Sequence, residues 1–429
     1  MQGSLVQDVV RQVLKQLHDP AAGMSSSREM ATPADLRRDF PLLAANPNMA
    51  YLDSAATTQM PQAVVQRLIR YYGNEHAVAH RGHHRLAEGA TAAYENARRT
   101  VQRFLHADDP RQIVFTAGAT DAINLVASGI RLAGLSRGDQ IIVSAMEHHS
   151  NFIPWMIACR QSGATLRVLG VNSQGELRLD QLPSMLNPRT RLLAVTHVSN
   201  CLGTVNPIAR IARMAHDRGV PVLVDGAQHV AHAPTNVREL DCDFYAFSGH
   251  KLLAPSGIGV LYAKSRWLDA LPPYRTGGGM VDDADFESVR FSAPPAKFEA
   301  GSPNVAGAVA LAAAIEYIET IGWTELQRIE HSLSQYLHAS LDTVPGLHRL
   351  GSRHGPLASF WLDGIDPPRI DAMLADHDIA VRSGRLCCRP LFKQLGLSGA
   401  VRASLSLYNT PRDIDRLIQV LHAIAKGRR

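Results

Sequence analysis

The chain has 429 residues, of which 45% are apolar and 19% are charged. These values are ordinary for a globular protein, so they exclude an intrinsically disordered chain, a collagen and a coiled coil. No uninterrupted apolar run approaches the roughly 18 residues of a membrane span. The first residues also lack the basic start, apolar block and cleavage site of a secretory signal. We therefore expect a cytoplasmic protein with no role for a membrane.

The charges are nearly balanced, with 44 basic and 39 acidic residues and a net charge of +5. No run of five or six lysines and arginines concentrates this excess, so no nucleic-acid partner is expected. The five cysteines are an odd number without the spacing of a disulfide framework. That usage is typical of a reducing compartment, and the spacing matches no zinc site, so no metal is predicted.

Residues 5–17 read LVQDVVRQVLKQL, a pattern that places the apolar side chains on one face of a helix. A stretch rich in Pro, Gly and Ser follows, up to about residue 30, and reads as a flexible linker. Because a short tethered helix cannot bury its own apolar face, we predict that it docks on a partner, a protein shell being one candidate. In that case the protein would lie inside the compartment that the shell encloses. Packing on its own subunit, fraying and binding to a membrane surface are the alternatives, and the few cations disfavour the last.

From residue 31 onward, short apolar runs alternate with helical patterns. The predicted strands are QIVFT, QIIVSA, ATLRVLGV, RLLAVTHVS, VPVLVDGA, DFYAFSG and GIGVLYA. Runs without polar alternation are buried on both faces, which is typical of a parallel sheet covered by helices. Functional residues in such folds lie at the carboxyl ends of the strands.

A Gly- and Pro-rich break, LPPYRTGGGM, occupies residues 271–280, and the small-residue helix VAGAVALAAAIEYIETIG follows it. We predict four segments from these features. They are a leader and linker (1–30), an N-terminal segment that joins a small domain (31–50), a large cofactor-binding domain (51–290) and a small C-terminal domain with the catalytic cysteine (291–429).

Two strand ends carry the residues of a candidate site. Asp225 ends the run VPVLVD, and Lys251 follows the run DFYAF in the segment SGHK. A lysine that bonds to an aldehyde and a carboxylate that keeps a ring nitrogen protonated would serve pyridoxal phosphate. A surface lysine and an aspartate that caps a turn are the alternative interpretation.

Three further residues follow strands of the same sheet. Thr120 lies where QIVFT turns into a helix, whose first N–H groups can hold a phosphate. His148 follows IIVSAM and can stack on a ring or move a proton, although a lone histidine at a strand end is more often structural. Asn200 follows RLLAVTHVS. All three are expected at the edge that carries Asp225 and Lys251.

Several motifs together resemble the cysteine desulfurases of the class V aminotransferase superfamily. They are YLDSAATT, AHRGHH, EHHSNFIPW, THVSNCLGT, VLVDGAQ, DCDFYAFSGHK, GIGVLY, FEAGSPN and VRASLSLYNT. The resemblance covers about residues 33–425 and is closest to the group II branch, the SufS and CsdA type. It implies an α/β fold, fold type I of the pyridoxal-phosphate enzymes. In that fold a large domain with a mostly parallel seven-stranded sheet precedes a smaller α+β C-terminal domain.

The resemblance also implies roles for single residues. It assigns the cofactor to Lys251 (covalent attachment), Asp225 (ring nitrogen), Gln228 (phenolic oxygen), His148 (stacking and acid–base chemistry), Thr120, Ala119, Ser248 and His250 (phosphate end), and to Ser302 from the other subunit of a homodimer. It assigns the substrate to Arg402, Asn200, His80 and Arg382, with Arg402 binding the carboxylate in bidentate fashion.

The family's nucleophile lies in a motif like R-[ST]-G-x-x-C-x-x-P, which residues 382–390 match with Cys387 in the cysteine position. Three positions depart from the family: Cys388 replaces a small residue, Arg385-Leu386 stand where a histidine is common, and Ala119 replaces a hydroxyl residue. Cys388 could form a disulfide with Cys387, relay sulfur or have no role. We favour the last, because a disulfide between adjacent cysteines is strained.

The predicted activity is therefore the conversion of L-cysteine to L-alanine, with a persulfide formed on Cys387. The resemblance implies transfer of this sulfur to an acceptor of the SufE/CsdE type, for iron–sulfur cluster assembly. A selenocysteine lyase, a cysteine sulfinate desulfinase or an aminotransferase of the same class is the alternative. A non-catalytic scaffold or dithiol protein is disfavoured by the presence of Lys251, Asp225, His148 and Arg402.

Overall fold

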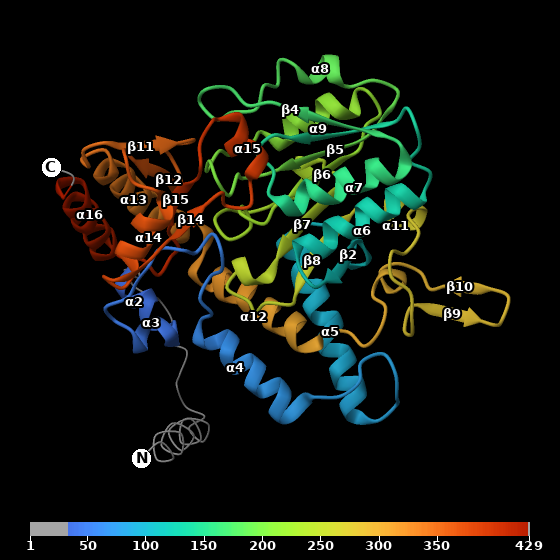
Figure 1. Ribbon diagram of the computed structural model, residues 1–429. Coiled ribbons are helices and arrows are strands. Elements are labelled where there is room, and N and C mark those ends of the chain that lie inside the picture. Colours follow the sequence, from blue (N-terminus) through green and yellow to red (C-terminus); the bar gives the residue numbers. More distant parts are fainter. Residues whose placement is uncertain (1–32, 428–429) are drawn as a thin grey trace. The chain divides into compact units, whose positions relative to one another are not determined.

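The computed structural model describes residues 33–427, so the helix predicted at residues 5–17 lies outside the described part. The main element is a seven-stranded sheet (Figure 1). Its strands, in their order across the sheet, are β2 (Ile113–Thr116), β8 (Gly259–Ala263), β7 (Phe244–Ser248), β6 (Val222–Asp225), β5 (Thr190–Thr196), β3 (Gln140–Ser144) and β4 (Thr165–Leu169).

Strand β8 runs antiparallel to both of its neighbours, β2 and β7, and the remaining strand pairs are parallel. The predicted fold, α/β with a mostly parallel seven-stranded sheet, is thus confirmed. The burial on both faces that was predicted for the uninterrupted apolar runs does not extend to β4, whose Thr165, Arg167 and Val168 are exposed. This strand lies at an edge of the sheet, beside β3, and its Thr165 and Arg167 give it the polar alternation of a half-exposed strand.

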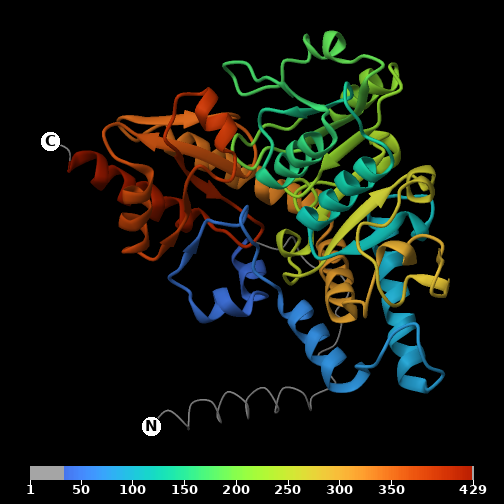
Figure 2. The same ribbon diagram turned by 45° about the vertical axis from the view of Figure 1, so that its right-hand side comes forward.

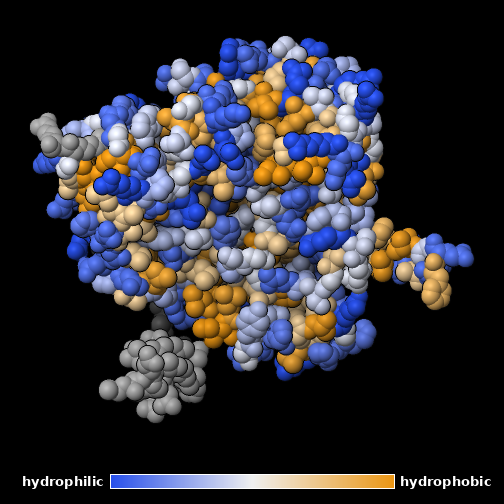
Figure 3. All heavy atoms as spheres, viewed as in Figure 1, coloured by the Kyte–Doolittle hydropathy of each residue, from blue (hydrophilic) through white to orange (hydrophobic). Residues whose placement is uncertain are grey.

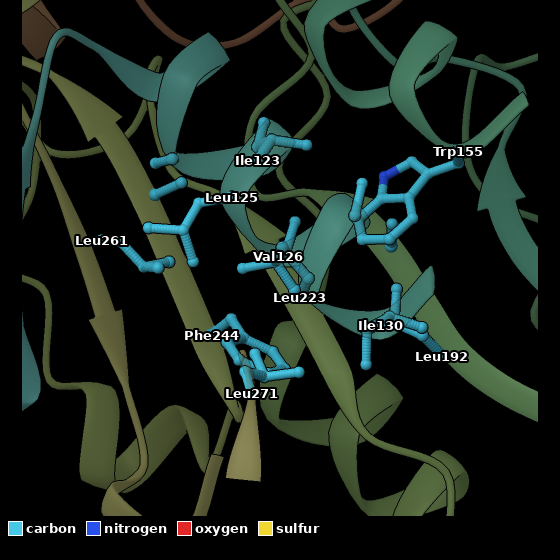
Figure 4. Packing of buried hydrophobic residues seen from close by; sticks show 14 of the residues in the cluster. Ile123, Leu125, Val126, Ile130, Trp155, Leu192, Leu223, Phe244, Leu261 and Leu271 are labelled. Carbon is cyan, nitrogen blue, oxygen red and sulfur yellow. The ribbon is translucent and has the colours of Figure 1, made fainter. Parts of the chain in front are cut away.

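Helix α6 (Ala119–Leu132) provides the largest apolar contact with this sheet. Its residues Ile123, Leu125, Val126 and Ile130 are buried against Leu192, Leu223, Phe244 and Leu261 of the strands (Figure 4). Full burial of such a side chain contributes about 1.5–3 kcal/mol. This packing fixes the position of the first turn of α6, which lies at the strand ends where functional residues were predicted.

The other helices of this part complete the layers around the sheet and link it to the rest of the chain. They are α4 (Gln62–Arg70), α5 (Arg85–Phe104), α7 (Ile153–Ser162), α8 (Leu182–Met185), α9 (Ile208–His216), α10 (Val237–Leu240), α11 (Ser265–Ala270) and α12 (Val305–Ile321). Helix α7 packs on β3 and β4, and α12 packs along α4 and α5 (Figures 1 and 2).

A second sheet is built from the C-terminal part of the chain. It is antiparallel, with the order β11 (Leu347–Leu350), β12 (Leu357–Leu362), β15 (Ala400–Ser404) and β14 (Arg382–Gly384). Its helices are α13 (Trp323–Leu341), α14 (Pro367–Ala375), α15 (Arg389–Gln394) and α16 (Pro411–Lys426). The short strand β14 leads directly into the segment that contains Cys387.

The first described segment packs against this C-terminal part. It contains α2 (Pro33–Arg38), α3 (Pro41–Ala45) and β1 (Ala50–Tyr51), and β1 pairs in parallel with β13 (Ile379–Ala380). The side chain of Arg37 donates to the carbonyl of Tyr408 at 3.3 Å. These contacts join the first described segment to the C-terminal part; the predicted domains and their boundaries stay predictions.

Strands β9 (Val281–Ala284) and β10 (Val289–Phe291) form an antiparallel hairpin that projects from the rest of the described chain (Figures 1 and 3). Phe286, between the two strands, is fully exposed. Within residues 33–427, no single helix is long and apolar enough to cross a membrane; α12 and α13, bent by 81° at their junction, meet those criteria of length and composition only as a pair.

Candidate active site

A cavity of about 330 Å³ opens at one edge of the large sheet. Strands β2, β3, β5, β6 and β7 all point their carboxyl ends toward this edge, because they run parallel to one another. The cavity is lined by predicted site residues, namely Ala119, Thr120, His148, Asn200, Asp225, Gln228, Ser248, His250, Lys251, Arg382, Cys387 and Arg402. The structure thus brings together twelve of the fourteen, and leaves out His80 and Ser302.

Asp225 and Lys251 are the opposite charges on the cavity floor. Asp225 ends β6 and is 5% exposed, with Oδ1 accepting from the N–H of Ala227 at 3.0 Å. Burial raises the pKa of Asp225, and the nearby ammonium of Lys251 opposes this. Burial also lowers the pKa of Lys251, and Asp225 again opposes the shift. The carboxylate therefore favours a cation in the cavity, and the lysine amine loses its proton more readily than one in water.

Close backbone approaches beside these residues leave no room for side chains. A Cβ atom on Gly226, next to Asp225, would lie 2.1 Å from the ring of Tyr245. A Cβ atom on Gly259, at the start of β8, would lie 2.4 Å from the Cα atom of Gly118. Glycine at these two positions lets β6 and the first turn of α6 take their places at the cavity edge.

The first turn of α6 and the end of β7 form a polar cradle. The N–H of Ala119 donates to Oγ of Ser248 at 2.8 Å, so these two predicted phosphate-end residues touch each other. The hydroxyl of Thr120 lies in the same turn and lines the cavity. Helix N-termini present unpaired N–H groups and a partial positive charge, which suits an anion.

His148 stands above the floor and is held through its Nδ1 atom. The N–H of Ser150 donates to this atom at 3.1 Å, and Oγ of Ser150 lies 3.0 Å from it. The hydroxyl of Ser150 in turn lies 2.7 Å from that of Thr120. Burial, with the positive charge of Lys251, lowers the pKa of His148 to about 3. The imidazole is therefore neutral near pH 7 and carries its proton on Nε2.

Glu147, the residue before His148, lies underneath and is 1% exposed. Its carboxylate accepts from the N–H of Thr196 at 2.8 Å and from Nδ2 of Asn151 at 2.6 Å, and it also accepts from the hydroxyl of Ser144. Burial raises its pKa to about 8. These contacts join the ends of β3 and β5 to the turn of His148, so they hold this turn at the cavity.

A pair of arginines forms the wall that comes from the small sheet. Arg402, on β15, is 2% exposed and donates to Oδ1 of Asp53 at 3.2 Å and to the carbonyl of Asn200 at 3.0 Å. Its Nε atom is buried without a hydrogen-bond partner. Arg382, on β14, donates to Oδ2 of the same Asp53 at 3.2 Å. Two guanidinium groups that share one carboxylate leave an excess positive charge, which suits a carboxylate ligand.

Cys387 lies at the mouth of the cavity, in the loop between β14 and α15. It is exposed, and both Cys387 and Leu386 have positive φ angles, of 54° and 47°. The carbonyl of Cys387 accepts from the N–H of His149 at 2.8 Å. The neighbouring Cys388 is buried, and both thiols are free. The motif spacing therefore selected the thiol that faces the cavity.

His80 and Ser302 line a different cavity, of about 440 Å³, together with Glu95, Arg98 and Glu299. His80 contacts Glu95, with 3.5 Å between Nε2 and Oε1. Ser302 was predicted to serve the cofactor of a second subunit, so its absence from the cavity of its own chain agrees with that role. His80 does not line the cavity of its own chain either, and its predicted role in substrate binding would require the same arrangement.

Sequence reasoning missed Asp53, Glu147 and Ser150 as parts of the site. Asp53 and Ser150 lie in motifs that carried the family resemblance, YLDSAATT and EHHSNFIPW. For Asp53 and Glu147 the available signal was a polar residue directly after a short apolar run, which is the signal that found Asp225. Their partners, Arg402 for Asp53 and Thr120 for Ser150, are far away in sequence, and the contacts could not be read from spacing.

The residues of the cavity fit pyridoxal phosphate. Among residues 33–427, Nζ of Lys251 and Oδ2 of Asp225 have no hydrogen-bond partner, so an amine and a carboxylate oxygen are both available to a ligand. The polar cradle at Ala119, Thr120 and Ser248 suits a phosphate group. A lysine, a carboxylate and an anion cradle in one cavity are the donor set that this cofactor requires.

The family model of the class V aminotransferases (Aminotransferase class-V) matches residues 50–417. The chain belongs to this family. It is 46% identical over 394 residues to a cysteine desulfurase of Dickeya dadantii, covering 91% of this chain and 96% of the relative.

Two solved structures are also similar. The cysteine desulfurase CsdA of Escherichia coli has a TM-score of 0.85 and 39% identity, covering 93% of this chain and 99% of CsdA. The cysteine desulfurase of Thermococcus onnurineus has a TM-score of 0.88 and 37% identity, covering 94% and 100%. The comparisons confirm the predicted family, fold type I and the class of enzyme, a pyridoxal-phosphate enzyme of the cysteine desulfurase type.

Proposed function

We propose that this cavity releases sulfur from L-cysteine and leaves it on Cys387, with L-alanine as the second product. The observation that carries the proposal is that an exposed thiol, Cys387, lines one cavity with the buried Asp225 and the partly buried Lys251. In this proposal Lys251 attaches the cofactor, Asp225 faces its ring nitrogen, and Arg402 with Asn200 receives the substrate carboxylate. Arg382 adds positive charge at the same wall.

When bound, pyridoxal phosphate supplies an electron sink that makes loss of a proton from the substrate Cα atom feasible. The remaining cofactor contacts come from Gln228 near the phenolic oxygen and from Ala119, Thr120, Ser248 and His250 at the phosphate end. Once the substrate amino group has displaced it from the cofactor, the amine of Lys251 would take the Cα proton, and its lowered pKa keeps it available as a base. Neutral His148 lines the cavity and would stack on the cofactor ring, with its Nε2–H available as a hydrogen-bond donor.

The sulfur step belongs to Cys387. Its thiolate attacks the sulfur of the substrate, so an S–S bond forms as the Cβ–S bond of cysteine breaks. The electron pair of the broken bond stays with the amino-acid fragment, which gains a proton at Cβ, regains the Cα proton from Lys251 and leaves as alanine. The persulfide remains on the chain until a thiol acceptor removes it.

The test is the release of alanine from L-cysteine under a reductant, for the unmodified protein and for Cys387→Ala in parallel. We expect release by the first and near-abolition in the second, with the yellow absorbance of the bound cofactor retained in both. Lys251→Ala, which removes the attachment point, should lose both the colour and the release.

Two results would contradict this assignment. Alanine release that survives in Cys387→Ala would mean that another thiol attacks the substrate sulfur. No release by a protein that holds its cofactor would favour another substrate of the class, such as selenocysteine, cysteine sulfinate or an aminotransferase pair, and each can be offered in the same assay.

We further propose a homodimer in which Ser302 and His80 of one copy complete the cavity of the other. The support is that these two residues share a cavity of their own, away from Lys251. The hairpin of β9 and β10 adds an exposed apolar side chain, Phe286, of the kind that a second copy covers. Mixing Ser302→Ala with Lys251→Ala tests this, because only a mixed dimer would contain one complete cavity.

The acceptor of the persulfide is proposed to be a protein thiol of the SufE/CsdE type, in iron–sulfur cluster assembly in the cytoplasm. The support is the exposure of Cys387 at the cavity mouth and the similarity to CsdA. A persulfide that passes to such a protein faster than to a small thiol at equal concentration would support this. Equal rates would leave the small thiol as the sufficient acceptor.

For the leader, we propose that the apolar face of residues 5–17 recruits the enzyme to a partner, a shell protein being the candidate. The support is the sequence pattern alone, since the motifs of the family core begin after residue 33. Deleting residues 1–30 should abolish capture of the partner while alanine release and dimerisation stay unchanged. Lowered stability or dimerisation, with no partner lost, would assign the segment to its own subunit instead.

A further inference from the structure

The two adjacent cysteines have opposite surroundings. Cys387 is exposed at the cavity mouth, whereas Cys388 is 0% exposed. The thiol of Cys388 points into the protein, and its Sγ donates to Oδ1 of Asn200 at 3.2 Å. Burial raises the pKa of Cys388 well above its usual range, so the group keeps the proton that it donates. A side chain in this position is not available to solvent or to an acceptor protein.

The thiol determines which way the amide of Asn200 faces. With Oδ1 on the thiol, Nδ2 of Asn200 donates to the carbonyl of Leu386 at 2.8 Å. The backbone of Asn200 is held separately, since its carbonyl accepts from Arg402 at 3.0 Å. A donor on one side and an acceptor on the other give the amide a single favourable orientation.

The carbonyl that Asn200 holds belongs to a strained segment. Leu386 and Cys387 both have φ angles in the left-handed region, 47° and 54°, which non-glycine residues rarely adopt. Such a conformation persists where surrounding contacts enforce it. Two hydrogen bonds do so here: Nδ2 of Asn200 binds the carbonyl of Leu386, and the N–H of His149 binds the carbonyl of Cys387.

We propose that Cys388 is a positioning residue: its S–H, acting through the amide of Asn200, holds the Leu386 carbonyl and thereby keeps Sγ of Cys387 at the cavity. The inference rests on the proposed function, because a change in alanine release reports on Cys388 only if alanine release is the reaction of this cavity. It gives Cys388 a role that is neither a disulfide partner nor a sulfur relay. No covalent change occurs at Cys388.

The test uses three variants of the cofactor-loaded enzyme. Cys388→Ala removes the donor, Cys388→Ser keeps a donor in the same place, and Cys242→Ala is the matched control. Cys242 is also 0% exposed, but it lies before the amino end of β7, whereas the cavity lies at the carboxyl ends of the strands. We expect kcat for alanine release to fall about tenfold in Cys388→Ala, because small displacements of a reacting group cost at least that much. Cys388→Ser should restore most of the rate, and Cys242→Ala should lose stability without losing rate.

A second measurement does not depend on turnover. The rate at which iodoacetamide alkylates Cys387, followed by mass spectrometry, should rise severalfold in Cys388→Ala, since the loop is no longer held. It should return toward the unmodified value in Cys388→Ser and stay unchanged in Cys242→Ala. A role of Cys388 in packing alone would change thermal stability in Cys388→Ala and Cys242→Ala alike, with neither rate affected.

The outcomes separate the two proposals. If the unmodified protein releases no alanine, the proposed function fails, and the alkylation rates still test the role of Cys388. If it does release alanine, equal kcat and equal alkylation in Cys388→Ala overturn the inference alone. Cys388→Ser as impaired as Cys388→Ala would also overturn it, as would sulfur found on Cys388 after one turnover, which would indicate a relay.

Discussion

On one side of the cavity, Asp225 and Ser248 stand at the ends of strands of the large sheet, 5% and 7% exposed. On the other side, Cys387 stands in a loop that follows a strand of three residues, β14, and it is exposed. The first side is positioned by a packed core of strands and the helix α6 (Figure 4). The second is held by single hydrogen bonds, from Asn200 to the carbonyl of Leu386 and from His149 to that of Cys387.

The difference follows from what each side does in the proposed reaction. Groups that hold a cofactor do the same task in every turnover and gain from rigidity. A thiol that first meets the substrate and then an acceptor protein must be reachable from both directions. A short loop held by a few breakable contacts allows this, because its local opening costs less than that of a core strand.

The largest effect is expected on the rigid side, from Asp225→Asn. The substitution keeps the shape and removes the charge that favours a cation on the cavity floor, so kcat should fall about 10²–10³-fold. Alanine release, with cofactor content measured in parallel, checks this. Asp243→Asn is the matched control, because Asp243 is 0% exposed at the opposite edge of the sheet and should affect stability only. Equal losses of kcat in the two variants would mean that the loss of any buried carboxylate lowers the rate, and that the position of Asp225 in the cavity is not the cause.

The rigid side is also the part that the sequence predicted best. Asp225, Lys251 and His148 each follow an apolar run, and the parallel strands bring such positions to one edge whatever the details of packing. The apolar runs predicted the strands, and the family motifs predicted the roles of the residues that follow them. The order of the strands, in contrast, depends on which strands pair in space, and single-strand patterns do not contain that information. Strands β2 and β4 are both at the edges of the sheet, although β2 is fully buried and β4 is largely exposed.

The loop side was predicted in identity but not in conformation. Spacing selected Cys387 as the nucleophile, and left the role of Cys388 open. The contacts on which the proposed role of Cys388 rests join residues far apart in the chain, Asn200 with Leu386 and Cys388. They depend on how the small sheet packs against the large one. Asp53 was missed for the same reason, because its partners Arg382 and Arg402 belong to the C-terminal part.

A smaller effect is expected at the boundary of the two sides, from Arg402→Lys. An ammonium cannot reproduce the planar fork that contacts Asp53 and Asn200 and, in the proposed complex, the substrate carboxylate. Loss of a charged hydrogen bond costs about 1.5–3 kcal/mol, so KM for L-cysteine should rise about 10- to 100-fold.

Arg382→Lys is the control for this prediction, since its side chain is half exposed and binds the same Asp53. Its KM should change by less than that of Arg402→Lys, because water competes for an exposed ion pair. Steady-state kinetics on both variants decide the order. A larger rise in KM for Arg382→Lys would mean that the substrate carboxylate binds Arg382, on β14, and not Arg402, on β15.

The smallest effect is expected in the pH dependence of stability, from His148→Gln. The pKa of His148 is lowered to about 3 by burial and by Lys251, from an ordinary value of 6.5. Between these two values the unfolded chain binds a proton that the folded chain does not, so the free energy of unfolding contributed by this group falls as the pH falls below about 6.5. Removing the imidazole should therefore flatten the acid limb of the stability curve.

Thermal unfolding of the cofactor-loaded enzyme between about pH 4.5 and 8 measures this limb, with His331→Gln, exposed on α13, as the control for loss of an imidazole. We expect the melting temperature of His148→Gln to fall less on acidification than that of the unmodified protein, by a few degrees at most. A parallel loss in both proteins would mean that His148 takes up a proton in the folded state. His148 would then resemble Cys387, in a part of the cavity wall that water can reach, and not the buried Asp225.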